Sequence, residues 1–544
     1  MADDNIDKLI QRWRRLNGDK SQWHSHWEDL ARVMLPRRMG FISTTIEGER
    51  RTDDIFDGTP MQAARSLANA VGGFMRPNGL PQVEMIVDDD ALNNIGEVQE
   101  WLADSEQRLS NAFNNPKARY RQTSSEYDQD IVVFGTAVEF VGESPKRNHL
   151  QFQSLHLKDV TPIFKEDGTA EGLFHHRRFT ARQLADRFGE NNLSEKTRKC
   201  LEDAPDRKIE MLHVVCPRKE YKQGLLFARN LPIADIWLEL EAKHKVAMGG
   251  FHEFPFIVGR WDTSSGEDYG RSPGMIALPD ADTLQSMGET ILIAGQRAAD
   301  PPLFAPNDGA FDAVNTFPGG LSYYDVETAT AMRGNPFFAL ESGANLPISR
   351  DMQLDTRQQI FSAFFRNVLN LPIEGPDMTA AEIHARKEEL IRELGSMFGL
   401  YETEKSVPEI ERGFMLMMRS GSFAPIPRVL QGKNVTFQYD SPVKRIRQQI
   451  EAAAARVWAM EMIELGQVKP EAIDLINVDE LGRFSAQALN IPRQVVNSRE
   501  VVADIQQARE KAMAAQAKLQ TVANVAEIAK TGAEAAKSSG LVKQ

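Results

Sequence analysis

The first part of the chain has the hydrophobic periodicity of a helix. The apolar residues Trp23, Trp27, Leu30 and Met34 recur at i, i+4, i+7 and i+11, which predicts one apolar helix face. Ser21 is a suitable N-cap for this helix, and Pro36 ends it. Two tryptophans on one stripe indicate core packing, with a subunit interface as the alternative. A second helix follows through 61–75, opened by the cap and first-turn pair Thr59-Pro60.

The pattern between Gln82 and Arg260 mixes short alternating runs with helical stretches. Lys165-Glu166-Asp167-Gly168 has turn chemistry between two of the runs. The segment therefore reads as an α+β unit. Its predicted strands are Val83–Val87, Ala137–Val141, Leu150–His156, Thr161–Lys165, Leu173–Phe179 and Ile209–Val215, and its predicted helices are Ile95–Phe113, Ser124–Phe134 and Ala181–Phe188.

Two helices then flank a segment of different composition. A helix is predicted from about Leu278 to Ala299, where Asp300-Pro301-Pro302 stops it. Residues 300–347 are rich in proline and glycine, with strand-like pieces such as Leu321–Val326. Helical periodicity resumes from Ser349 to Asn370. The order helix, compact β-and-loop insertion, helix is typical of a stalk that carries a head.

A strongly specified break separates this second helix from the next. Pro372, Gly375 and Pro376 stop the helix, and the Thr379–Glu382 capping box restarts it toward Arg419. One strand, Val435–Tyr439, and the helices Lys444–Gly466, Pro470–Asn477 and Val478–Leu489 follow. The Ala-rich stretch Arg499–Lys537 has only a thin apolar stripe, so it is either partly disordered or bundles with copies of itself.

Composition narrows the class of protein. The 544 residues are 42% hydrophobic and 26% charged, which indicates a globular chain with several structural units. The sequence has no secretory signal pattern and no apolar run long enough for a membrane helix. Two cysteines exclude a disulfide framework. A net charge of −13 argues against a protein that coats nucleic acid, but not against one that lets it slide past.

No motif carries catalytic chemistry. Gly270–Gly274 matches the G-x-S-x-G nucleophile elbow, yet Pro273 follows the serine and has no N–H for an oxyanion hole. The pairs His24/His26 and His175/His176 lack the i, i+4 spacing of a metal site and read as structural histidines. Asp88-Asp89-Asp90 reads as a solvated turn, and the glycine-rich segment 71–79 lacks the Gly-Lys-Ser/Thr ending of a phosphate loop. We therefore expect no enzyme, no metal and no cofactor.

Four local segments, in order and spacing, resemble the head-to-tail connector, or portal protein, family of short-tailed bacteriophages. They are Arg65–Ala70 with the following Gly-Phe-Met and Pro-Asn-Gly, Asp130–Ala137, Tyr269–Pro273, and Met378–Ile383. The resemblance covers nearly the whole chain. It implies a mainly α fold with an α+β wing and a small β-rich clip, in subunits that form a ring, usually a dodecamer, at one capsid vertex.

The resemblance also implies a division of the chain. Transferred to this sequence, it gives a wing at 1–270, stem helices at 271–299 and 348–370, a clip at 300–347, a channel (tunnel) loop at 371–378, a long helix and wing strand at 379–440, a crown at 441–498 and a C-terminal helical extension at 499–544. The channel loop would present Leu371, Ile373, Glu374, Asp377 and Met378, and candidate lumen charges on the second stem helix are Arg350, Arg357, Arg366, Asp351 and Asp355.

The implied function is a conduit for DNA packaging by a terminase and for genome ejection. The implied partners are copies of the chain itself, terminase, tail adaptor and tail tube proteins, capsid and scaffolding proteins, and double-stranded DNA held without sequence preference. The implied place is the portal vertex of the virion, after assembly in the host cytoplasm and without membrane contact.

Two other classes stay open: a different virion ring or shell component, such as a tail adaptor or capsid subunit, and an unrelated enzyme or scaffold with a helical stalk. The segment 371–378 could also be a simple surface turn.

Overall fold

A computed structural model provides the structure of the chain. It describes residues 6–44, 46, 48–80, 83–87, 89–93, 95–144, 149–218, 220–221, 227, 230–299, 303–307, 321–325, 338–339, 346–366, 395, 397–432, 435–439, 442–467, 469–489, 491, 495–497, 499, 501–516 and 530–531. The chain divides into two units, and each is described by itself. The first holds residues 1–84, 108–423 and 437–443, and the second holds residues 85–107, 424–436 and 444–544.

The first unit opens with three helices: α1 (Ile6–Asp19), α2 (Ser21–Met34) and α3 (Thr59–Met75). The predicted apolar face of α2 is confirmed, because Trp27 and Leu30 are fully buried. Ser21 is not the N-cap. Lys20 occupies that position in a helical conformation, because α1 continues almost directly into α2. The Lys20 ammonium is buried and donates to the carbonyl oxygens of Leu157 (2.9 Å) and Val160 (2.7 Å).

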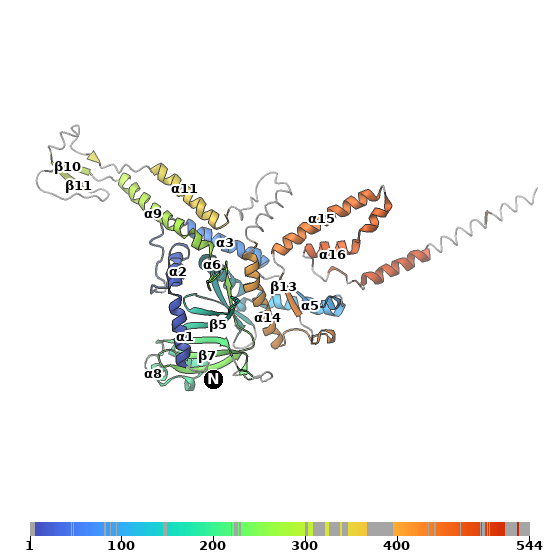
Figure 1. Ribbon diagram of the computed structural model, residues 1–544, viewed down its shortest axis with the longest axis horizontal. Helices are drawn as coiled ribbons and strands as arrows, with labels where there is room; N and C mark the ends of the chain where they lie inside the picture. The colour runs from blue at the N-terminus through green and yellow to red at the C-terminus, as the bar shows by residue number, and fades with distance from the viewer. Residues whose placement is uncertain are drawn as a thin grey trace, which may run out of the picture. The chain divides into compact units, whose positions relative to one another are not determined.

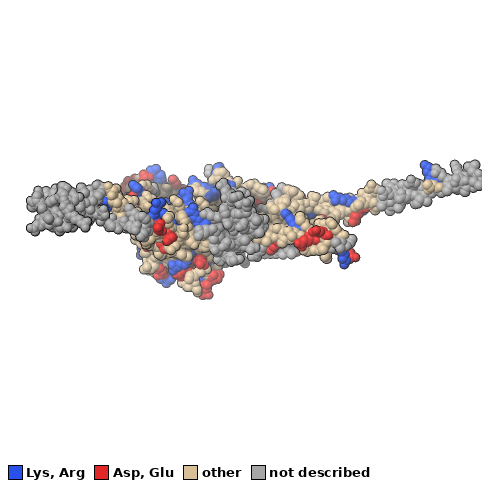
Figure 2. Space-filling model, turned by 90° about the horizontal axis from the view of Figure 1, so that it is seen from above, with Lys and Arg blue, Asp and Glu red and all other residues tan. Residues whose placement is uncertain are grey.

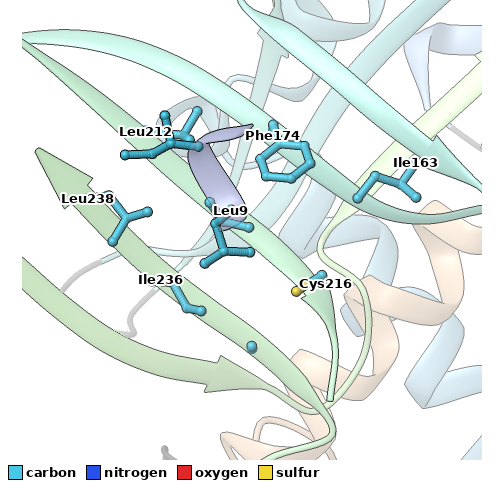
Figure 3. Close-up of a cluster of buried hydrophobic side chains, with 10 residues drawn as sticks. Leu9, Ile163, Phe174, Leu212, Cys216, Ile236 and Leu238 are labelled. Atoms are coloured by element: carbon cyan, nitrogen blue, oxygen red, sulfur yellow. The ribbon is translucent and has the colours of Figure 1, made fainter. Parts of the chain in front are cut away.

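A five-stranded antiparallel sheet, in the order β4-β5-β6-β7-β8, forms the largest β element. One face packs on α1 through Leu9 and Ile10, which meet Phe174, Leu212 and Ile236 in the cluster shown in Figure 3. Helices α7 (Ala181–Phe188) and α8 (Glu195–Asp203) cover part of the other face. The strands are β4 (Val160–Phe164), β5 (Ala170–Thr180), β6 (Lys208–Pro217), β7 (Ile233–Glu239) and β8 (His244–Phe251).

A second, three-stranded sheet has the order β3-β2-β9 and packs against α6. Its strands are β2 (Thr136–Glu143), β3 (Leu150–Leu155) and β9 (Phe256–Arg260), and α6 spans Tyr120–Phe134. The α+β prediction for the segment 82–260 is therefore confirmed. The sequence pattern missed α8, β7, β8 and β9, and it placed the start of α6 too late.

Two backbone segments cross in contact where α6 passes into β2. Gly135 has a φ of +76°, and a Cβ atom there would lie 2.3 Å from the Gly270 carbonyl oxygen. A Cβ on Gly270 would lie 2.2 Å from the Gly135 oxygen. The crossing is tied by hydrogen bonds from Gly270 N to Thr136 Oγ1 (2.8 Å) and from Ser272 Oγ to the Val133 oxygen (2.7 Å). Only glycine fits at both positions.

This crossing is the base of the long helix α9 (Pro273–Ala299). The helix starts earlier than the predicted Leu278, because Ser272 caps it through the Met275 N–H and Pro273 suits its first turn. Helix α11 (Leu346–Ala363) runs beside α9, with β10 and β11 beyond the end of α9 (Figure 1). Helix α11 is interrupted by a turn at Phe364 and Phe365, the latter with a φ of +54°, and Arg366 is helical again. The rest of the predicted helix, 367–370, lies outside the described residues.

The segment between the two helices contributes a three-stranded sheet, as its composition predicted. Strand β10 (Leu303–Asn307) pairs in parallel with β11 (Leu321–Asp325) and antiparallel with β12 (Phe338–Ala339). The predicted channel loop at 371–378 and its capping box at 379–382 lie outside the described residues. Helix is described again from 397 to 400, followed by a π-turn at Glu402–Ser406 and α14 (Val407–Arg419).

The second unit is mainly helical. It holds α4 (Asp90–Asn93), most of α5 (Gly96–Phe113), α15 (Pro442–Gly466), the short 3₁₀ helix Pro470–Leu475, α16 (Val478–Ala488) and a helix at 501–516. Arg499 pairs with Glu480 at 2.9 Å, so the last helix begins against α16. Strands β1 (Val83–Val87) and β13 (Val435–Tyr439) form a two-stranded sheet, as both were predicted.

We predict that Gly135→Ala or Gly270→Ala destabilises the first unit by about 3 kcal/mol, because each added methyl overlaps backbone that has no room to shift. Thermal unfolding of the purified variants measures this. Gly295→Ala is the matched control: Gly295 lies in α9 with open space around its Cβ position, so alanine there should be neutral or slightly stabilising. Equal stability of all three variants would contradict the crossing as a packing constraint.

Candidate functional site

The helix pair α9–α11 keeps apolar side chains on its surface. Its inner positions are occupied, with Leu284 and Ile360 fully buried. Large apolar side chains also point outward, where nothing in the described part of the subunit covers them. These are Ile276, Leu292 and Ile293 on α9 and Met352 and Leu354 on α11, with exposed fractions between 41% and 72%. A monomer gains nothing from exposing these apolar side chains, whereas an assembled neighbour would remove them from water.

The candidate lumen charges, four on α11 and Arg366 just beyond it, fall into three environments. Arg350, Asp351 and Asp355 are exposed. Arg366 is half-buried, with its guanidinium 4.1 Å from the ring centroid of Phe361. The fifth, Arg357, is engaged within the subunit.

The Arg357 guanidinium donates from Nε (2.9 Å) and Nη2 (2.7 Å) to one oxygen of Asp57. Asp57 precedes α3, and Gln285 on α9 accepts from its N–H at 2.9 Å. Burial opposes ionisation of Asp57, but hydrogen bonds from Thr59 and Arg357 lower its pKa overall. The segment before α3 is thus bonded to both long helices. Asp57 already compensates the Arg357 charge, which weakens any contact of Arg357 with a phosphate.

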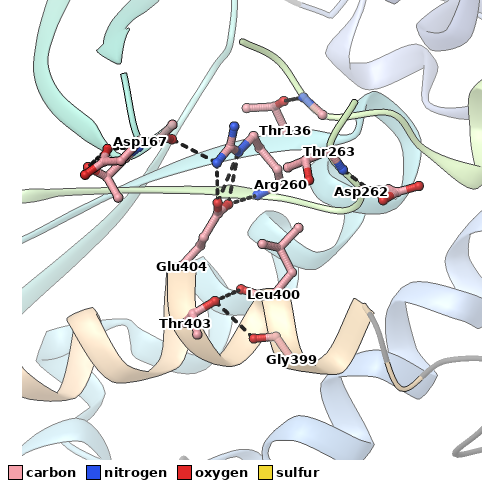
Figure 4. Close-up of polar contacts among 12 residues, drawn as sticks. Thr136, Asp167, Arg260, Asp262, Thr263, Gly399, Leu400, Thr403 and Glu404 are labelled. Carbon is pink, nitrogen blue, oxygen red and sulfur yellow. Dashed lines mark hydrogen bonds and ion pairs between the residues drawn. The ribbon is translucent and has the colours of Figure 1, made fainter. Parts of the chain in front are cut away.

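A second set of charged contacts fixes the π-turn at Glu402–Ser406, where the chain continues after the undescribed segment. Glu404 accepts from the backbone N–H of Arg260 (2.8 Å) and from its Nε (3.1 Å), as Figure 4 shows. The same guanidinium donates to the Gly168 carbonyl at 2.8 Å, in the turn between β4 and β5. Arg260 therefore links the π-turn to the three-stranded sheet β3-β2-β9 and to the five-stranded sheet.

Beside this link, Lys405 is buried against two carboxylates. Its ammonium lies 2.8 Å from Glu139 on β2 and 3.5 Å from Glu409 on α14. All three side chains are almost fully inaccessible to solvent. Burial raises the pKa of Glu409, with the neighbouring Glu139 adding to the shift and Lys405 opposing it. One ammonium balances one carboxylate, so Glu409 is the group that keeps its proton most readily.

A third buried contact joins the same helix to α3 and α6. Arg76, at the end of α3, donates to both the Asp128 carboxylate and the Tyr401 hydroxyl. Tyr401 in turn donates to Asp128 at 2.7 Å. Burial and the Asp128 charge raise the pKa of Tyr401, so its hydroxyl remains a donor. Three charged contacts within one stretch of helix set its rotation and register.

These contacts escaped the sequence pattern, because their partners lie far apart in the chain and none forms a short motif. The only local signal is the i, i+4 pair Lys405 and Glu409, and other charged residues in the segment 402–412 surround it.

The residues that suggested catalysis or metal binding serve the fold instead. Ser272 is buried as a helix cap, with its hydroxyl donated to a carbonyl. Burial lowers the pKa of His24 to about 4 and that of His175 well below its usual value, so both stay neutral. Over the described residues, no three His, Cys, Asp or Glu side chains gather as a metal site, and no helix has the length and apolarity to span a bilayer.

Comparison with known proteins places this architecture in one class. The family model for the bacteriophage head to tail connecting protein matches residues 6–496. A probable portal protein of Bordetella phage BPP-1 is 26% identical over 520 residues, which cover 93% of this chain and 92% of the relative. The portal protein of Salmonella phage epsilon15 is 26% identical over 525 residues, covering 95% and 93%.

A solved chain titled as the virion of a native gene transfer agent particle aligns with 77% of this chain and 92% of its own, at 11% identity and a TM-score of 0.32. That score is too low to carry an argument.

The class defined by these findings is a structural component of a phage virion. The chain belongs to the family of bacteriophage head-to-tail connecting proteins. The predicted family and the predicted function, a portal or head-to-tail connector that serves genome packaging and ejection, are confirmed.

We predict that Glu409→Gln stabilises the protein at pH 9 relative to the wild type, on the order of 1–2 kcal/mol, and by much less at pH 6. The raised pKa of Glu409 means that the folded state holds its proton above the pH at which the unfolded chain releases it. Stability is therefore lost as pH rises through this window, and glutamine removes the loss. Chemical denaturation at the two pH values measures it.

Glu139→Gln is the control in the same cluster. It removes the closest partner of Lys405 and should destabilise the protein at both pH values. A Glu409→Gln variant that is less stable at pH 9 than at pH 6, relative to the wild type, would contradict the assignment of the proton to this carboxylate.

Proposed function

We propose that the chain forms a closed ring, a dodecamer in line with its family resemblance, through which double-stranded DNA passes during packaging and ejection. The observation that carries the proposal is the set of large apolar side chains exposed on α9 and α11. In a closed ring each subunit has a neighbour on both sides, so side chains on different faces of the two helices could be buried in every copy. The ring would act without catalytic chemistry of its own.

The proposed division of labour follows the predicted segments. Residues 1–270 and 379–440 would form the wing, 271–299 and 348–370 the stem, 441–498 the crown and 499–544 an extension into the head. The clip at 300–347 would meet the terminase and later the tail adaptor or tail tube. Its three strands on the end of the α9–α11 pair support a docking head carried by a stalk. Capsid and scaffolding proteins would contact the wing during assembly in the host cytoplasm.

A conduit must hold DNA weakly, because each lysine or arginine that contacts a phosphate releases counterions and adds affinity. The net charge of −13 disfavours tight binding. On the face that Figure 2 shows, basic and acidic side chains are interspersed. Of the candidate lumen charges, exposed Arg350 has Asp351 and Asp355 close by in sequence. We propose that these charges give a channel wall over which phosphates slide.

We predict that the double variant Leu292→Glu/Ile293→Glu assembles poorly, with rings appearing only at roughly tenfold or higher protein concentration, because charges replace apolar contacts between subunits. Negative-stain imaging and analytical ultracentrifugation of the full chain measure this. Ala298→Glu is the control: it adds a charge at an exposed position of the same helix, on the side away from Leu292 and Ile293, and should leave assembly unchanged.

A wild-type chain that forms an open polymer, a shell or no assembly would overturn the ring itself. Normal rings from the double variant would show only that α9 faces away from the neighbouring subunit.

We further predict that Glu374→Lys with Asp377→Lys leaves rings intact but makes packaging or retention of DNA more salt-dependent, with a slope set by about one counterion per new phosphate contact. The proposal that 371–378 faces the channel underlies this, since the loop carries two acids and no base. Packaging assays over a salt series measure the effect. The neutral pair Glu374→Gln with Asp377→Asn should show a smaller change. Wild-type behaviour of the Lys variant across salt would place the loop away from DNA.

A further inference from the structure

The half-exposed end of the five-stranded sheet carries a group of aromatic rings. Phe179 ends β5, Phe188 ends α7 and Trp237 lies on β7. The ring centroids of Phe188 and Trp237 are 5.3 Å apart, and those of Phe179 and Trp237 are 6.1 Å apart. Trp237 is buried, whereas the two phenylalanines are only partly covered. This face of the sheet is the one opposite α1.

Two arginines lie over these rings. The guanidinium carbon of Arg177 is 4.6 Å from the Phe179 centroid, and that of Arg187 is 5.8 Å from the same centroid. Arg187 is also 4.6 Å from the Trp237 centroid. The two cations therefore share one aromatic surface. We refer to Arg177, Phe179, Arg187, Phe188 and Trp237 as the Arg–aromatic patch.

Neither guanidinium makes a hydrogen bond or an ion pair with any residue that the structure describes. Burial lowers the pKa of Arg177 to about 10, and the charge of Arg187 contributes to the shift. Asp235 is the acid whose charge acts on Arg187, but its carboxylate is already bonded to His213 Nε2 at 2.7 Å. The neighbouring Arg178 differs: it is exposed on the other face of β5 and pairs with Glu210 at 3.2 Å.

Two like charges held together with all their donors unused are unfavourable for the subunit alone, because each is partly desolvated and repels the other. A carboxylate would accept parallel N–H bonds from a planar guanidinium and cancel the repulsion. Arginine and aromatic side chains together also form the energetic centres of protein interfaces. The Arg187 guanidinium already lies within 5.8 Å of the Phe179, Phe188 and Trp237 centroids, so a nucleic-acid base that stacked here would have to displace it.

We propose that the Arg–aromatic patch binds an acidic segment of a protein partner, whose Asp or Glu carboxylates bridge Arg177 and Arg187. This site is separate from the exposed apolar side chains of α9 and α11, and it does not depend on ring closure. It gives the connector a second, charge-selective contact on its five-stranded sheet. The partner is defined by its chemistry, a run of carboxylates, and by the geometry of two guanidinium forks on an apolar floor.

The test uses the full chain and a fluorescein-labelled hexaglutamate peptide, with binding followed by anisotropy at low salt. The wild type should bind the peptide, and Arg177→Gln/Arg187→Gln should bind it roughly tenfold more weakly or less. Arg178→Gln removes one nearby arginine from the opposite face and should leave binding unchanged. Inorganic phosphate is the competing probe, and it should displace the peptide only at concentrations well above those of free hexaglutamate.

Three results would overturn the proposal. The first is peptide binding that is absent in the wild type or equal in the double variant. The second is equal loss in Arg178→Gln, which would mean general charge attraction. The third is displacement by phosphate as readily as by hexaglutamate, which would mean a site for a free anion. The thermal midpoint of the double variant is the control on folding. It should be unchanged or raised, and a lowered midpoint would assign the two arginines to the fold instead.

Discussion

The contact of Gly135 with Gly270 is the constraint on which the first unit depends. It brings the end of α6, the start of β2 and the start of α9 to one point, at distances that no side chain permits. Ser272 then caps α9 while it donates to Val133 on α6, so the direction of α9 is fixed relative to the sheet β3-β2-β9. Helix α11 and the strands β10–β12 continue from α9. Their placement therefore depends on the backbone crossing, together with the contacts of α11 with α9 and α3 and the Arg357–Asp57 ion pair.

The helix that follows the undescribed segment is held by a different kind of force. Glu404, Lys405 and Tyr401 are fixed by charged or polar partners on β9, β2, α3 and α6. Close packing tolerates small slips of a helix, because one apolar side chain can replace another. Buried charges do not, because a slip of one residue would leave an ammonium or a carboxylate unpaired. The two modes are complementary: packing gives α9 its direction, and charge pairing gives the π-turn and α14 their register.

Local sequence patterns predicted many of the helices and strands, but few of the contacts in the candidate site. Periodicity predicted α3, α7 and the strand Val83–Val87, because each depends on neighbours in sequence. The predicted cap of α3 was wrong: Thr59 lies inside the helix and Gly58 is the N-cap. Strands β7 and β8 were missed, since β7 is mostly buried and β8 mostly half-covered, so neither alternates clearly between core and solvent. The charged contacts of the π-turn cannot be found from such patterns, because Lys405 and Glu139 are separated by 266 positions. Arg357 shows the same limit: an arginine on a stem helix suggested a lumen charge, and its partner Asp57 lies 300 positions away.

The pairing of arginines within the subunit also explains how a connector can contain many arginines and still bind DNA weakly. Arg76, Arg260 and Arg357 each have a carboxylate partner in the same subunit, so none is free to hold a phosphate. The strength of DNA binding depends on the number of free cations that meet phosphates, not on the number of arginines in the sequence. By using arginines to join distant segments, the fold gains specific contacts and at the same time lowers its affinity for DNA. Among the described residues, Arg177 and Arg187 have no carboxylate partner of this kind, so their charges remain available to the acidic segment that we propose.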